Sequence, residues 1–306
     1  MYQAASQHAI HKAAIRLAAH DKRGKPQAMI FRNTLCSLVL YALPLAPLAA
    51  APATVTPGTD KAGNAILPLK VESQGALAAS EQACSPDKRF CVELVYQQND
   101  APPQLKLLRM QGKDTDARFE LPALKTEARN IQLALWPHVL TLADTAQGAL
   151  LGVEENASAM YSGGGANAST LHLYRIYPNG KDMALREVLA LPTFGNELIR
   201  ACFSDQDYRE RRGACHDESE FSSRISLDNQ VMAGFPRLIY QTRATSFPGN
   251  ISPMSDSRSR PARKTRSLVT VVDAECTFRR TISFNAITGV YAPDKPLPDC
   301  GQYVEP

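Results

Sequence analysis

The residues best suited to chemistry lie in one acidic run, His216-Asp217-Glu218-Ser219-Glu220. Its carboxylates and its histidine are side chains that bind a cation or act as a general acid and a general base. A calcium loop needs acids at alternate positions around a glycine, and this run lacks that spacing. We therefore interpret the run as a solvated acidic loop, and we keep a carboxylate-based hydrolase as an alternative function.

Other candidate motifs lack the partners that their chemistry needs. The run Tyr161-Ser162-Gly163-Gly164-Gly165-Ala166-Asn167 has no lysine and hydroxyl after its last glycine, so it is not a Walker phosphate loop and is interpreted as a turn. The chain has no Gly-x-Ser-x-Gly elbow and no Cys-x-x-Cys pair. His138 and His172 each lack a catalytic partner nearby in the sequence. The sequence thus identifies no catalytic residue, no metal ligand and no cofactor.

An even set of cysteines follows an apolar segment near the N-terminus. In an exported chain such a set indicates disulfide bonds formed in an oxidising compartment. Sequence proximity favours three local pairs, although other pairings stay open, and each local loop closure would stabilise the fold by about 2–4 kcal/mol. The favoured pairs are Cys84–Cys91, Cys202–Cys215 and Cys276–Cys300.

The second of these pairs would enclose a highly charged loop, Asp205 to Arg212. Tyrosine and arginine often anchor protein interfaces. A disulfide that limits the loop's conformations would also lower the entropic cost of docking. The alternative is a surface loop whose charges pair internally. The predicted partner-binding residues are Tyr208, Arg209, Arg211 and Arg212.

The apolar segment begins at an internal methionine, Met29, and is followed by small residues up to Ala53. A basic start, a short apolar run and a small-residue exit are typical of a secretory signal peptide. A membrane span needs about 20 consecutive apolar residues, and Pro44 and Pro47 interrupt this run. We expect a dispensable or misassigned extension over 1–28, a signal peptide over 29–53, a periplasmic or secreted protein, and no membrane span after processing.

The positive charge of the chain lies in its N-terminal segment. Residues 1–53 hold six of the 34 Lys and Arg and one of the 30 Asp and Glu, so without them the formal net charge falls from +4 to −1. Binding to nucleic acid depends on neutralised phosphates. We therefore expect no nucleic-acid partner.

Short alternating runs separated by turn residues predict an all-β, mostly antiparallel fold. In Cys276–Phe284, apolar residues alternate with polar ones, as in a half-buried strand. Asn179-Gly180 predicts a hairpin, and short helices are expected at most, at Ala123–Ala128 and Glu197–Cys202. The other predicted strands are Phe90–Gln97, Gln104–Met110, Ile131–Trp136, Val139–Ala143, Ala149–Glu154, Leu171–Tyr177, Arg186–Leu191, Arg237–Thr242 and Leu268–Asp273.

After the signal peptide, the predicted domain plan has two parts. Residues 54–66 contain several turn residues and are expected to be flexible, and residues 67–306 form a disulfide-stapled β-rich domain. Within that domain, 244–266 is rich in serine and arginine and poor in apolar residues, so a mobile loop is expected there.

Ser85-Pro86-Asp87-Lys88 and the run Phe90–Tyr96 after it resemble the Ser-Pro-Asp-Gly turn and strand of β-propeller blades. Lys88 stands where those blades have a glycine, which commonly takes a positive φ. The resemblance implies a β-propeller. Packed β-sheet domains are the alternative architecture.

Disulfide-held loops, few histidines and the lack of a catalytic motif favour a non-catalytic binding module. We expect a protein partner in the cell envelope, as for an inhibitor, an immunity protein or an assembly accessory. One alternative is a periplasmic hydrolase that uses carboxylates. The other is a sugar or small-molecule binding module that uses Trp136, Tyr161 and Tyr174.

Overall fold

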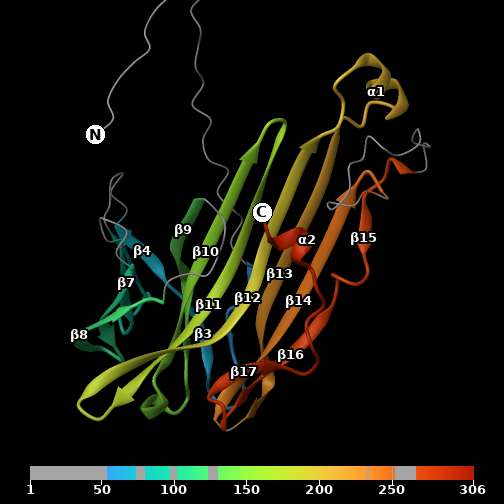
Figure 1. Cartoon of the computed structure of the whole chain (residues 1–306). Coiled ribbons are helices and arrows are strands. Elements are labelled where there is room, and N and C mark those ends of the chain that lie inside the picture. Colours follow the sequence, from blue (N-terminus) through green and yellow to red (C-terminus); the bar gives the residue numbers. More distant parts are fainter. Residues whose placement is uncertain are drawn as a thin grey trace, which may run out of the picture. The chain divides into compact units, whose positions relative to one another are not determined.

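Strands make up most of the residues that the structure describes, and every described strand pair except β1 with β13 is antiparallel, which confirms the prediction of a mostly antiparallel all-β fold (Figure 1). The computed structural model describes residues 54–73, 80–96, 102–122, 130–232, 234–249, 251 and 267–306. The expectations for 1–53, for a helix at Ala123–Ala128 and for the serine- and arginine-rich part of 252–266 lie outside these residues.

The larger sheet has 12 strands, and six long ones form its centre. These are β9 (Asn130–Thr141), β10 (Ala149–Tyr161), β11 (Gly164–Asn179), β12 (Asp182–Arg200), β13 (His216–Met232) and β14 (Phe235–Phe247). The strand order is β17-β16-β14-β13-β12-β11-β10-β9-β3-β2, while β1 pairs with β13 and β15 with β14. The short members are β1 (Thr54–Val55), β2 (Gly58–Thr59), β3 (Ala65–Pro68), β15 (Val271–Asp273), β16 (Arg279–Asn285) and β17 (Val290–Pro293).

The smaller sheet has five strands in sequence order. They are β4 (Lys70–Ser73), β5 (Ser80–Cys84), β6 (Cys91–Val95), β7 (Gln104–Met110) and β8 (Lys113–Glu120). The predicted Ser85–Lys88 turn joins β5 to β6, and Lys88 adopts the positive φ of 54° that the resembling turn gives to glycine. The described strands nevertheless form one long sheet and one short sheet, with no radial set of blades. The packed-sheet alternative is therefore correct, and the propeller alternative is wrong.

Two neighbouring strands of the large sheet, β12 and β13, pair over only part of their length. β12 and β13 pair only from Phe194↔Ser222 to Arg200↔His216 and then separate. The sheet therefore divides into two half-sheets, which share a hydrophobic core that includes Trp136, Leu171 and Leu238. The first half-sheet consists of β12, β11, β10, β9, β3 and β2, and the second of β13, β14, β16 and β17. The outer side of the first half-sheet packs on the five-stranded sheet through a second core, which includes Val92, Leu105 and Val153. The β layers are thus stabilised by two separate cores.

Three disulfides link Cys84–Cys91, Cys202–Cys215 and Cys276–Cys300, which confirms the pairs favoured by sequence proximity. The last one ties the C-terminal helix α2 (Gly301–Val304) over β11, β12 and β13. Tyr303 joins Phe221 and Ala244 in a small third core there. A side chain at Gly195 would place its Cβ 1.8 Å from the carbonyl oxygen of Tyr303, so this close packing requires glycine.

Several segments differ from the sequence-based expectation. Glu197–Arg200 continues β12 and is not helical. Residues 54–66 contain β1, β2 and the start of β3, because buried Asp60 accepts hydrogen bonds from the Asn64 backbone and side chain. Ala244–Phe247 belongs to β14, so this part of the expected loop 244–266 is a paired strand. The predicted Asn179-Gly180 hairpin is confirmed between β11 and β12.

The described helices are too short to cross a membrane. They are η1 (Thr145–Gln147), α1 (Asp205–Glu210) and α2. None of the described helices combines the length and hydrophobicity of a membrane span.

Candidate functional site

The distal end of the large sheet, where β12 and β13 are joined, carries a short capped helix (Figure 1). Ser204 caps α1 by accepting a hydrogen bond from the Asp207 backbone N–H at 3.1 Å. The Asp207 carboxylate accepts one in return from the Phe203 backbone N–H at 2.9 Å. Such reciprocal capping stabilises a helix start. The spacing Ser204-x-x-Asp207 is the sequence signal that could have predicted this helix.

Arg211 lies inside this connection and not on its surface. Its Nε donates to the Ala214 carbonyl at 2.7 Å, and its guanidinium forms a buried ion pair with Asp217 of β13. The expectation that Arg211 anchors a partner therefore needs correction, because its charge is already used to hold the connection against the sheet.

The other predicted partner-binding residues are exposed. Tyr208, Arg209 and Arg212 all present their side chains to solvent, and the Tyr208 side chain is 59% exposed. Phe203, which the sequence analysis did not single out, is 55% exposed and lies under the guanidinium of Arg200, with 5.2 Å from the Arg200 Cζ to the ring centroid. The disulfide-closed connection thus presents two aromatic rings and two cations.

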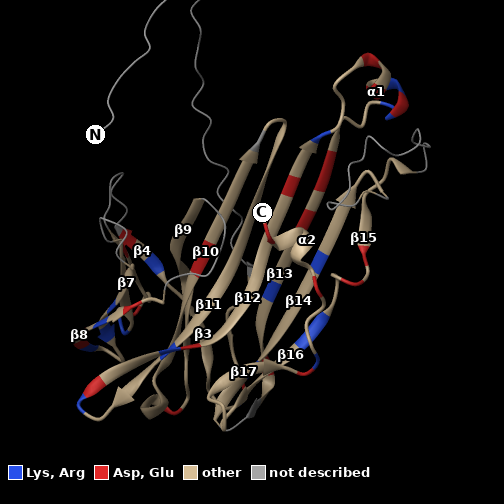
Figure 2. Ribbon diagram, in the orientation of Figure 1, with Lys and Arg blue, Asp and Glu red and all other residues tan. Residues whose placement is uncertain are grey.

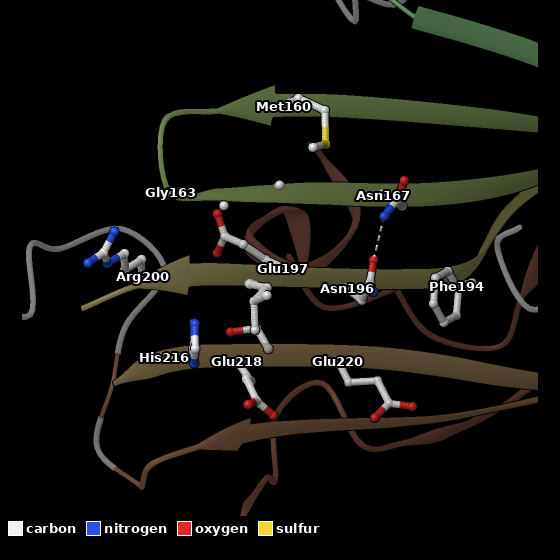
Figure 3. A pocket seen from close by; sticks show the side chains of 14 residues that line it. Met160, Gly163, Asn167, Phe194, Asn196, Glu197, Arg200, His216, Glu218 and Glu220 are labelled. Carbon is white, nitrogen blue, oxygen red and sulfur yellow. Dashed lines mark hydrogen bonds between the residues drawn. The ribbon is translucent and has the colours of Figure 1, made fainter. Parts of the chain in front are cut away.

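A groove of about 730 Å³ adjoins this connection on one face of β10 to β13 (Figure 3). The register of the strands determines which residues form the floor of the groove, because residues paired across antiparallel strands point to the same side of the sheet. One row across the strands consists of Met160, Gly165, Leu198 and Glu218. A Cβ on Gly165 would lie 2.8 Å from the Met160 Sδ, so the bare glycine leaves space for that thioether over β11.

The second row of the groove is polar. Asn167 and Asn196 are joined by a 3.0 Å side-chain hydrogen bond, and Glu220 lies opposite Asn196 (Figure 3). Glu218 and Glu220 are both exposed, and within the described residues neither forms an ion pair. Arg200 and His216 close the end of the groove toward the disulfide. The groove thus combines an apolar row with an acidic margin.

The acidic run His216–Glu220 is a strand and not the loop that the sequence suggested. It pairs with both β12 and β14, so its residues alternate in direction. Asp217 and Ser219 are buried, while Glu218 and Glu220 face solvent. General acid catalysis usually relies on a carboxyl group desolvated in a cleft, and two carboxylates on an open strand face do not provide that environment.

A histidine held between two carboxylates lies elsewhere, on β10 to β12. His172 Nδ1 donates to Glu187 at 2.8 Å, and its Nε2 donates to Glu155 at 3.2 Å. Burial opposes protonation, but these hydrogen bonds and charges outweigh it and raise the pKa of His172 to about 9. The ring is therefore protonated at neutral pH with both nitrogens occupied. It has no lone pair for general base catalysis, so this cluster gives the hydrolase alternative no support.

The aromatic residues named for sugar binding do not line an accessible site. Trp136 and Tyr174 are almost fully buried in the two large cores, and the structure does not describe the side chain of Tyr161. In the described ranges, no set of three or more His, Cys, Asp and Glu side chains is arranged to hold a metal ion.

Comparison with known proteins adds no relative. No protein-family model, no curated protein and no solved structure matches the chain. The site must therefore be interpreted from its own geometry.

Replacing Arg211 by alanine should destabilise the protein by about 3 kcal/mol, because it removes the buried guanidinium that pairs with Asp217. Arg209→Ala, on the exposed side of the same helix, is the matched control and should change stability by less than about 0.5 kcal/mol. Urea unfolding of both variants measures this. Equal stability of the two variants would contradict the structural role of Arg211.

The His172 cluster predicts a pH-dependent contribution to stability. The folded pKa of about 9 exceeds the unfolded value near 6.5, so the contribution is fully present below pH ~6.5 and is lost as pH rises through about 9. His172→Gln should cost about 2 kcal/mol at pH 6 and much less at pH 10. Unfolding of wild type and variant across this range, with the exposed His216→Gln as control, checks it. A difference independent of pH would refute the assignment.

Proposed function

We propose that this protein is a non-catalytic binding module whose distal surface binds another protein. The distal surface is defined here by the exposed apolar side chains at the end of the large sheet: Met160, Leu198, Phe203, Tyr208, Val269, Val271 and Val272. The exposed fraction is 83% for Met160, 43% for Leu198, 55% for Phe203 and 59% for Tyr208.

The clustering of these side chains is the observation that supports the proposal. The described residues include only two other exposed large apolar side chains, Val71 and Ile287. The β15 residues Val271 and Val272 pair with the same distal part of β14 that pairs with Glu218–Glu220. Exposed apolar groups gathered at one end of a protein, with polar residues around them, are typical of an interaction site.

Rigid support adds to the proposal. The Cys202–Cys215 disulfide and the buried Arg211–Asp217 pair hold the α1 connection, so ordering it on binding costs little conformational entropy. Phe203 and Tyr208 offer large contact areas, and Arg209 and Arg212 lie nearby in the chain. Aromatic and arginine side chains are the residue types that most often carry binding energy.

Three disulfides support a location in an oxidising compartment, as the signal-like segment at 29–53 also suggests. An envelope protein partner fits this location. The residues that the structure describes supply no desolvated catalytic pair in favour of the hydrolase alternative, and the burial of Trp136 and Tyr174 does not favour the sugar-binding one.

Replacing Phe203 and Tyr208 together by alanine should weaken capture of the partner about thirty-fold or more, since each aromatic anchor contributes about 1 kcal/mol or more. The measurement is quantitative affinity capture from an envelope extract, with thermal unfolding to show that the variant remains folded. Ile287→Ala is the matched control, because Ile287 is 96% exposed but lies in the β16–β17 turn. Equal recovery by wild type and the double variant would remove the connection from the interface.

A further inference from the structure

The groove beside the α1 connection has a composition that selects a class of ligand. It is open along β10 to β13 and shows apolar side chains from Met160, Leu198 and Phe194. Its volume of about 730 Å³ lies within the range of roughly 300–1,000 Å³ typical of ligand pockets. The groove is therefore large enough for several side chains of a peptide.

The margin of the groove is acidic. Glu218 and Glu220 line it, against Arg200 and His216 at its end (Figure 3). Arg200 is already engaged, since its Nε donates to the Cys202 carbonyl at 2.9 Å and its guanidinium lies over Phe203. An anionic ligand would meet the exposed carboxylates of Glu218 and Glu220, whereas ammonium or guanidinium groups would form charge-assisted hydrogen bonds with them.

The acidic character is local to the distal end. On the same face of β13, the residues that follow Glu220 are Ser222 and then Arg224. Ser222 pairs with Arg243 of β14. Figure 2 shows acidic segments on the distal part of β13 and basic ones farther along β13 and β14. A cationic ligand is thus favoured in the groove and disfavoured beyond it, which defines where it lies.

We propose that the groove binds a cationic segment of the protein partner that also carries aliphatic side chains. The apolar row Met160–Gly165–Leu198 would take the aliphatic groups, and Glu218 and Glu220 would pair with the lysines or arginines. β10 and β13 are three strand spacings apart, about 14 Å, which an extended peptide spans with about five residues. This inference rests on the proposed function, because it names the chemistry of the partner segment.

The test uses a fluorescein-labelled peptide of alternating lysine and leucine, about six residues long to cover that span, and the full chain. Fluorescence anisotropy should show binding that weakens with added salt, as expected for exposed charge pairs. A glutamate–leucine peptide should bind much more weakly, and so should a lysine–serine peptide. Equal binding of the lysine–leucine and glutamate–leucine peptides, or no binding of the former, would overturn the proposal.

Two sets of variants locate the binding. The double variant Glu218→Gln, Glu220→Gln should bind the lysine–leucine peptide about five-fold more weakly. The control variant Glu120→Gln, Asp182→Asn loses the same amount of charge at exposed positions outside the groove and should bind the peptide as the wild type does. Leu198→Ser should also weaken binding, with Ile287→Ser as its control. Unchanged binding in the groove variants would place the peptide elsewhere and refute the site.

The proposed function and this inference can fail separately. Phe203→Ala with Tyr208→Ala should reduce partner capture while leaving peptide binding largely intact, because neither ring lines the groove. If that variant loses partner capture and the wild-type protein does not bind the peptide, the proposal of a cationic partner segment is rejected while the proposed function stands. If the groove variants abolish peptide binding but neither they nor the Phe203 and Tyr208 variant reduces partner capture, the proposed function is rejected.

Discussion

The structure depends on where β12 and β13 pair and where they separate. They pair only between Phe194–Arg200 and His216–Ser222. The register of β12 against β11 shifts beside Pro192, and proline has no N–H to continue a ladder. Beyond this point the two half-sheets turn toward a shared core that includes Trp136 and Leu238. A single long sheet thus buries its own apolar residues, while its distal end stays an open, continuous surface.

That open end is supported from its other face. The Cys276–Cys300 disulfide holds α2 against the sheet, where Tyr303 packs on Phe221 and Ala244. The same strands therefore have a small core on one side and the groove on the other. The Cys202–Cys215 disulfide closes the connection directly beyond the paired segment. Exposed apolar groups are tolerated here because the backbone beneath them is fixed by pairing and covalent links.

Local patterns predicted much of the fold. Alternation located most of the long strands, Asn179-Gly180 predicted a hairpin, and proximity predicted all three disulfides. The sequence pattern did not predict β13, because its inward positions include the polar residues Asp217, Ser219 and Ser223, and such residues are typical of a loop. Tertiary packing makes these positions buried. The burial of Arg211 was missed for the same reason, since its partner Asp217 is buried only once β13 forms.

The groove could not be predicted from sequence, because its row of Met160, Gly165, Leu198 and Glu218 depends on the register of four strands. A shift of one residue would turn every side chain to the other face. The central claim is that the distal end contacts the partner. Its most direct test is site-specific photo-crosslinking in intact cells from positions 198, 208 and 287. If the distal end contacts the partner, positions 198 and 208 give one common adduct and position 287 gives none. The same adduct from 287 with none from 198 and 208 would contradict it.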